Sequence, residues 1–189
     1  MPEAATGADL DRLASLVGRY MPRRLAILGD FLHARSGRVD GTMEAFGAWR
    51  AAHAELDVLL VRGNHDRGAG DPPEGWKIRV VNEPHSDAGD GRIVMAHDPK
   101  AERAGADGLH TGMICGHIHP GVTMFGAVRT LRAKCFWLRP SVCVLPAFGS
   151  FTGCHVIEPA GDDRIFVIGP DAVAEAPRRS AMSQRRFRG

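Results

Sequence analysis

Two segments carry apolar residues at the three- and four-residue spacing of an amphipathic helix. The first runs from Ala8 to Tyr20 and stops before Pro22, which cannot continue a helix. The second runs from about Gly41 to His53. Their apolar positions are Leu10, Leu13, Leu16 and Val17 in the first, and Met43, Phe46 and Trp49 in the second.

Short continuous apolar runs flank the second helical segment. Arg24 to Leu28 reads RLAIL and stops at Gly29, and Leu56 to Val61 reads LDVLLV and stops just before Gly63. A strand, helix, strand order of this kind predicts a right-handed crossover in a parallel sheet. The fold class is therefore α/β.

The second half of the chain loses the helical period and predicts a β-rich region. The turn-rich stretch 71–75 (DPPEG) separates the two halves. The short apolar or alternating runs that follow are 77–81, 92–96, 113–115, 122–125, 130–138, 142–145 and 164–168.

Length and charge suit one globular unit. The chain has 189 residues, of which 44% are hydrophobic and 24% charged, so one core is expected. We predict a domain over 2–169 and a disordered, arginine-rich tail over 170–189. The net charge of +2 is too small to indicate nucleic-acid binding by itself. No run approaches the roughly 18 apolar residues of a membrane span, and the start of the chain lacks a signal pattern, so the cytoplasm is the expected location.

Cysteines and aromatic residues give weaker signals. The four cysteines form no CxxC pair, so neither a disulfide framework nor a zinc ribbon is indicated. Aromatic residues make up 6% of the chain and do not alternate with basic ones, so the sequence marks no platform for stacking single-stranded bases. The segment 147–153 (AFGSFTG) reads either as a binding loop or as a tight structural turn.

Four polar clusters each follow a predicted strand. They are GDFLH at 29–33, GNHD at 63–66, AHDP at 96–99 and GHIH at 116–119. Loops at the carboxyl ends of strands in an open α/β sheet meet in one crevice, so these clusters are expected to converge. Carboxylate, amide oxygen and imidazole nitrogen together favour Mn, Fe, Zn or Co over Mg or Ca.

In this order the clusters resemble those of the calcineurin-like metallophosphoesterase superfamily, whose pattern is DxH, GDxxH, GNHD, GH and GHxH. The segments VRGNHDRGAGDPP, CGHIHP, CFWL and VLPAFGSFTG are similar to the bacterial ligase-associated DNA damage response endonucleases within it. The resemblance covers about residues 2–168. It implies a four-layer α-β-β-α sandwich that cuts phosphate esters, here as a DNA endonuclease or phosphodiesterase linked to DNA repair.

The resemblance also implies roles for individual residues. It implies two divalent metal ions, most simply Mn²⁺, bridged by Asp30. His65 is expected to act on the leaving oxygen, with Asp66 orienting it, and His33 to orient a metal ligand. One metal site would be completed by Asn64, His97 and His117, and the other would be served by His119. Arg35 and Arg62 flank the motifs as candidates for a substrate phosphate, although the pattern favours solvated surface arginines.

The chain departs from the family pattern at its first motif. No DxH follows an apolar strand, and Asp9-Leu10-Asp11 lacks the histidine and lies in the first predicted helix. We therefore expect a fold lacking the first strand, an unpaired sheet edge, a weak second metal site and impaired activity. A truncated sequence and a natural loss explain this departure equally well.

Two other functions fit the same residues. One is a phosphatase acting on small molecules, and the other is a non-catalytic module that binds metal and nucleic acid. The resemblance also implies DNA-repair ligase or helicase partners and a homodimer, with no membrane.

Overall fold

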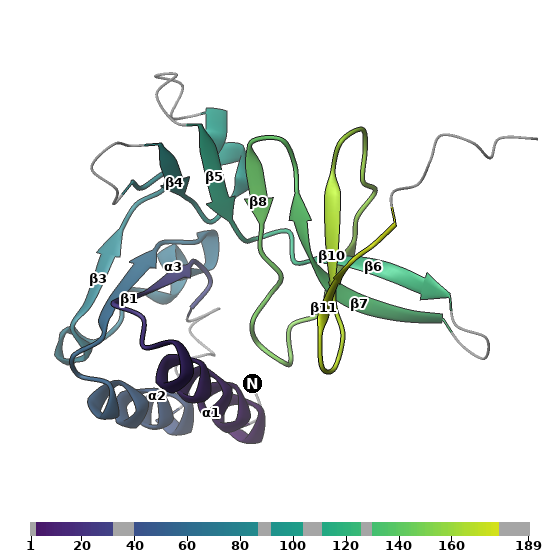
Figure 1. Cartoon of the computed structure of the whole chain (residues 1–189). Helices are drawn as coiled ribbons and strands as arrows, with labels where there is room; N and C mark the ends of the chain where they lie inside the picture. The colour runs from purple at the N-terminus through teal and green to yellow at the C-terminus, as the bar shows by residue number, and fades with distance from the viewer. Residues whose placement is uncertain (1–2, 32–39, 87–91, 104–110, 126–129, 178–189) are drawn as a thin grey trace, which may run out of the picture.

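The computed structural model describes residues 3–31, 40–86, 92–103, 111–125 and 130–177. The described residues form two sheets and three α-helices, of which α1 and α2 are the long ones. Figure 1 shows α1 and α2 gathered against one sheet while the long β6 and β7 strands project away from it. Within these residues, no helix is both long and apolar enough to cross a membrane.

The first sheet has three parallel strands in the order β1 (Arg24–Leu28), β2 (Asp57–Val61) and β3 (Ile78–Val81). The helices α1 (Glu3–Tyr20) and α2 (Asp40–Ala52) contact each other and cover this sheet. The strand β2 is central and almost wholly buried from Val58 to Val61. This is the predicted β-α-β crossover.

An aromatic cluster holds the helices to the first sheet. Phe46 and Trp49 project from α2 at helical spacing and are 6% and 7% exposed. Phe31 and Trp76 complete the cluster, with ring centroids 4.6 Å and 5.0 Å from that of Phe46. Burying large rings of this kind supplies most of the free energy that fixes α2 on the sheet.

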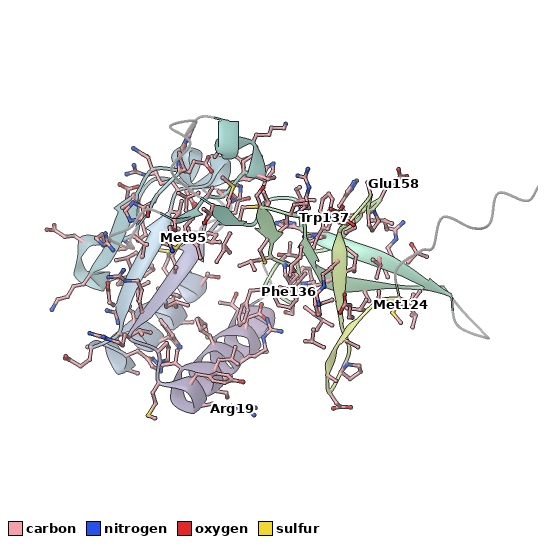
Figure 2. All side chains as sticks on the ribbon, turned by 45° about the horizontal axis from the view of Figure 1, so that its top comes forward. Arg19, Met95, Met124, Phe136, Trp137 and Glu158 are labelled. Atoms are coloured by element: carbon pink, nitrogen blue, oxygen red, sulfur yellow. The ribbon has the colours of Figure 1, made fainter. Side chains whose placement is uncertain are left out.

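The second sheet has eight strands. Its main path has six strands in the order β11 (Val173–Glu175), β10 (Arg164–Ile168), β7 (Thr130–Leu138), β8 (Val142–Val144), β5 (Gly112–Cys115) and β4 (Ile93–Met95). Two further strands branch from this path: β6 (Pro120–Phe125) pairs with β7, and β9 (His155–Val156) pairs with β6. The strands β4, β5 and β8 are parallel, and β7 is antiparallel to its neighbours. Figure 2 places Trp137 near the middle of the molecule and Met124 near the outer end of the β6–β7 pair.

The structure confirms the α/β class and the β-rich second half, with element ends shifted by a few residues. Two short helical turns, Glu74–Trp76 and Pro99–Arg103, lie where loops were expected. The helix α3 (Asn64–Ala69) was not predicted, because its sequence NHDRGA has no apolar period. The strand β11 pairs with β10. The division into a domain over 2–169 and a tail over 170–189 stays a prediction.

Two expectations concern the layers and the sheet edge. The described α-helices α1 and α2 lie on the first sheet, and the four-layer sandwich stays a prediction. Within the described residues β1 pairs only with β2, so β1 is one edge of the first sheet, and the absence of a first strand stays a prediction. The arginines after residue 177 lie outside the described residues.

Candidate metal centre

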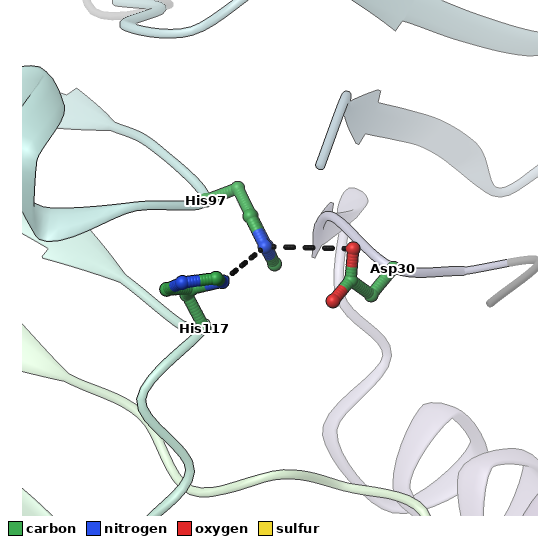
Figure 3. A group of neighbouring side chains, drawn as sticks. All are labelled: Asp30, His97 and His117. Atoms are coloured by element: carbon green, nitrogen blue, oxygen red, sulfur yellow. Dashed lines mark hydrogen bonds and ion pairs between the residues drawn. The ribbon is translucent and has the colours of Figure 1, made fainter. Parts of the chain in front are cut away.

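Three predicted ligands from loops of the two sheets come together. Asp30 follows β1 of the first sheet, whereas His97 follows β4 and His117 follows β5 of the second sheet. One ligand atom from each of these side chains lies within 4.8 Å of the others. Figure 3 shows the carboxylate of Asp30 and the ring of His117 on either side of the His97 ring.

His97 is the centre of this group. Its Nε2 atom lies 2.9 Å from Oδ1 of Asn64, 2.9 Å from Nδ1 of His117 and 3.4 Å from Oδ1 of Asp30. The rings of His97 and His117 meet edge to face, with centroids 4.7 Å apart. All four side chains predicted to share one metal site are therefore in contact.

The hydrogen bond made by Nδ1 of His97 determines which ring nitrogen is left to bind a metal. Nδ1 lies 2.9 Å from the carbonyl oxygen of Leu28, which can only accept, so Nδ1 carries the hydrogen. Neutral His97 then presents a lone pair at Nε2, facing the oxygen atoms of Asn64 and Asp30. His97 is 1% exposed, so water does not reach it freely, and a cation bound between these atoms would satisfy the converging lone pairs.

Two glycines let the chain segments approach closely enough to form this group. A Cβ on Gly29 would lie 2.3 Å from Nδ1 of His97, and Gly29 has a positive φ of +78°. A Cβ on Gly63 would lie 2.4 Å from Oδ1 of Asp30. The glycines of GD and GN are therefore required by space around the ligands.

Backbone strain concentrates on the same residues. Asp30, His117 and His119 have positive φ values of 53°, 64° and 51°. Such values cost about 1 kcal/mol or more for residues with a side chain and persist mainly where function requires them. A positive φ takes each of these three residues out of the extended conformation of the neighbouring strand.

Glu83 supports the loop that carries His97 and was missed by the sequence analysis. Its Oε2 atom accepts hydrogen bonds from the backbone N–H groups of His97 and Asp98 at 2.8 and 2.9 Å. A single acidic residue between Asn82 and Pro84 gives no motif, so only the position just after β3 marks it. Glu83 fixes the backbone of a predicted ligand from outside the metal group.

The remaining predicted residues surround the group. Burial lowers the pKa of His119. The carboxylate of Asp30 raises it in part, and the charges of His117 and His97 lower it further. A lowered pKa keeps the imidazole neutral, which is the form that binds metals. His65 donates its backbone N–H to Oδ1 of Asp30 at 3.2 Å. His119 is not in the group of Asp30, His97 and His117 whose ligand atoms lie within 4.8 Å of one another, and its assignment to a second metal site stays a prediction.

Asp66 closes the first turn of α3. Its buried carboxylate accepts the backbone N–H of Gly63 at 2.9 Å. This contact holds the GNHD turn in the shape that brings Asn64 to His97. The predicted action of Asp66 on the His65 side chain stays a prediction.

Of the two arginines proposed to bind a substrate phosphate, only Arg62 is among the described residues, and it is bonded to other side chains. Arg62 donates to both carboxylate oxygens of Asp71 at 2.9 and 2.6 Å and to Oδ1 of Asn82 at 3.0 Å. The hydrogen bond with Asp71 raises the pKa of Arg62. These contacts favour a structural role for Arg62. His33 and Arg35 lie outside the described residues.

An open hollow of about 730 Å³ adjoins the group on the His117 side. Its lining includes Asp98, Lys100, Trp137 and His155. His117 has a side chain that is 38% exposed, so it faces both the buried His97 and the hollow. A substrate entering this hollow would reach the group from its open side.

The fold and the site together define an α/β protein with a centre, shared by two sheets, whose donor atoms suit a divalent transition metal. No protein-family profile matches the chain, and no curated protein matches it. Among solved structures, the chain is similar to the crystal structure of nuclease MPE from Pseudomonas putida, with a TM-score of 0.74 and 41% sequence identity. The match covers 86% of this chain and 75% of that one. The chain therefore belongs to the same family as that nuclease.

Proposed function

We propose that the chain is a metal-dependent phosphodiesterase of the metallophosphoesterase superfamily that cuts nucleic acid. The observation that carries the proposal is the convergence of Asp30, Asn64 and His117 on Nε2 of buried His97. A group of side chains suited to bind a metal, in a chain that is 41% identical to a nuclease, supports phosphodiester hydrolysis.

The donor set fits a transition metal. One carboxylate, one amide oxygen and two imidazoles form a mixed N and O set that suits Mn²⁺, Fe²⁺, Zn²⁺ or Co²⁺, and Mn²⁺ is the ion we propose. A bound ion would polarise a phosphoryl oxygen and lower the pKa of a coordinated water. We propose a second, weaker site that uses Asp30 and His119.

The chain's own residues would orient the substrate and move a proton. His65 is exposed at the start of α3, next to the carboxylate of Asp30, and is the proposed donor to the leaving oxygen. Asp66 fixes the turn that presents it. The substrate we propose is DNA, and its link to DNA repair rests on the resemblance of the four segments named above.

Hydrolysis assays test this function directly. Purified protein is supplied with Mn²⁺ and given bis(p-nitrophenyl) phosphate, p-nitrophenyl phosphate and DNA, and bound metal is measured per chain. We expect cleavage of the diester and of DNA that EDTA abolishes. Asp30→Ala should lose both metal and cleavage, whereas His65→Ala should keep the metal and lose turnover.

The same assays separate the other two functions. Cleavage of the monoester but not of DNA would identify a small-molecule phosphatase. Bound metal without any cleavage would identify a non-catalytic binding module. Metal-dependent cleavage that persists in Asp30→Ala would reject the site.

A further inference from the structure

The strand β6 leaves much of one side open. On one side it pairs with β7 from Gly121 to Phe125, whereas on the other side β9 pairs with it only at Pro120 and Gly121. In the part of the chain that the structure describes, no strand pairs with residues 122–125 on that second side. Figure 1 shows this end of the β6–β7 pair projecting away from the rest of the molecule.

The backbone groups of Thr123 and Phe125 point toward the open side. The N–H of Ile157, which follows β9, donates to the carbonyl oxygen of Gly121 at 3.0 Å, so the polar backbone groups of Gly121 point away from β7. In an antiparallel pair the direction of these groups alternates from one residue to the next. The groups of Thr123 and Phe125 therefore also point away from β7, where a further strand could take up their hydrogen bonds.

An exposed apolar pair marks the same end of β6. Met124 lies directly opposite Leu131 of β7, and the two residues are 48% and 47% exposed. Val122 and Ala133 form the next pair on that face of the two strands. Val122 packs against the core cluster around Cys135, so the apolar face continues outward from the core. An apolar face that continues past the core indicates a contact surface.

The open side of β6 also lacks the protection that the other sheet edges have. A sheet edge can pair with another chain, and proteins usually prevent this with charged residues or by covering the edge. The edge strands β1, β3 and β11 contain Arg24, Arg79 and Glu175. The outer side of β4 is bridged at Met95 by His85. The strand β6, with the sequence PGVTMF, contains no charged residue.

An uncharged edge suits a second copy of the same edge. A two-fold contact places a residue on the axis beside its own copy, where two like charges would repel. A partner selected by charge would find none on β6. Arg132 of β7 lies opposite Thr123. In a sheet continued through two copies of β6, Arg132 would stand three strand spacings, about 14 Å, from its own copy, beyond the Debye length of about 8 Å.

We propose that two copies of the chain pair antiparallel through their β6 edges, about a two-fold axis beside Met124. In this register Thr123 of each copy lies opposite Phe125 of the other, and these residues exchange backbone hydrogen bonds. The two Met124 side chains stand side by side on one face and bury each other, with Leu131 next to them. The contact is short, so the association is weak. It is independent of the proposed function, because no predicted metal ligand lies in β6.

Self-association is measured by sedimentation equilibrium of the full chain at micromolar to millimolar concentrations. The parent protein should show a monomer–dimer equilibrium. Met124→Lys should weaken dimerisation more than about 10-fold, because each added amine would lie beside its own copy. Met124→Leu should dimerise like the parent. Val173→Lys is the matched control, since Val173 is 55% exposed on the edge strand β11, and it should also dimerise like the parent.

An exchange of charge tests the position of the axis. Met124→Lys and Met124→Glu should each stay monomeric when alone. Fluorescently labelled Met124→Lys, titrated with unlabelled Met124→Glu, should form a heterodimer whose affinity falls as salt is added, because opposite charges then meet across the axis. A mixture of the two variants that stays monomeric would overturn the inference.

Thr123→Pro tests the backbone pairing. The N–H of Thr123 points away from β7, so proline at this position removes a hydrogen bond between the copies and none within the chain. The variant should unfold in urea at the parental midpoint and no longer dimerise. Dimerisation of this variant at the parental affinity, a parent that stays monomeric throughout, or an equal loss in Val173→Lys and Met124→Lys would each overturn the inference. A parent that dimerises but cleaves no nucleic acid would instead reject the proposed function.

Discussion

Gly29 and His97 are packed so closely that a single methyl group between them would lie 2.3 Å from Nδ1 of the histidine. Gly29 comes from the end of β1 and His97 from the loop after β4, so this contact joins the two sheets. The same nitrogen is hydrogen-bonded to the carbonyl oxygen of Leu28. The position of the central imidazole is therefore set by a glycine of the opposite sheet.

Gly29→Ala should remove metal binding and destabilise the fold by roughly 2–5 kcal/mol, because it combines a positive φ with overpacking. Urea unfolding and Mn²⁺ titration would measure the two effects. Gly161→Ala is the control, since Gly161 has a φ of +55° and open space around its Cβ position. That variant should lose only about 1–2 kcal/mol and keep its metal. Equal metal affinity in the two variants would contradict the packing argument.

Removal of a ligand should affect metal binding more than the fold. Asp30→Asn and His117→Ala should each weaken Mn²⁺ binding more than about 100-fold. Loss of a residue that only hydrogen-bonds a metal ligand usually weakens binding by about 10- to 100-fold, and loss of a ligand should cost more. Isothermal titration would measure the affinity. His155→Ala, which alters another histidine of the neighbouring hollow, should leave the affinity unchanged. If His155→Ala weakened the metal as much as His117→Ala, the assignment of ligands would be wrong.

Glu83 should act as a positioning residue. Glu83→Ala leaves the backbone N–H groups of His97 and Asp98 without their acceptor, so we expect a 10- to 100-fold loss of metal affinity. Glu83→Gln keeps one oxygen that can accept both hydrogen bonds, and should recover most of the affinity. A loss of stability in Glu83→Ala with parental metal affinity would show a purely structural role.

Cys135 should be unreactive in the folded protein. It is fully buried, and burial raises its pKa to about 11, so little thiolate exists near pH 8. The folded state favours the neutral thiol, so the contribution of Cys135 to the free energy of unfolding is fully present below the unfolded pKa of about 9. It is lost as the pH rises toward the folded pKa of about 11. Alkylation at pH 8 mapped by mass spectrometry should spare Cys135 until urea is added. Labelling without urea at the rate of half-buried Cys143 would contradict this.

The sequence predicted that Asp30, Asn64, His97 and His117 converge, because each of them closely follows a strand. Asp30 and Asn64 follow glycines, and His117 stands in GHIH, so local sequence already encodes the close approach. His97 was the least marked of the four, yet it proves to be the central one. Its role comes from contacts with residues that follow strands of the other sheet, which no local pattern shows.

The supporting residues could not be predicted for the same reason. Glu83 and Lys134 act on carbonyl and N–H groups of loops that are distant in the chain or on another strand. Their contacts depend on where those loops come to rest. The helix α3 was missed because capping by Asp66, rather than an apolar stripe, stabilises it.

The division of the ligands between two sheets has a mechanical consequence. Asp30 and Asn64 belong to the three-stranded sheet and His97 and His117 to the eight-stranded one, and no strand pair among the described residues joins the two sheets. An ion bound by residues of both sheets would link the two sheets to each other. Because the ion binds only the folded chain, saturation at a hundred times its dissociation constant would add about 2.7 kcal/mol to the free energy of unfolding. The melting temperature should therefore rise with ion concentration, and chelation should loosen the two halves of the molecule from each other.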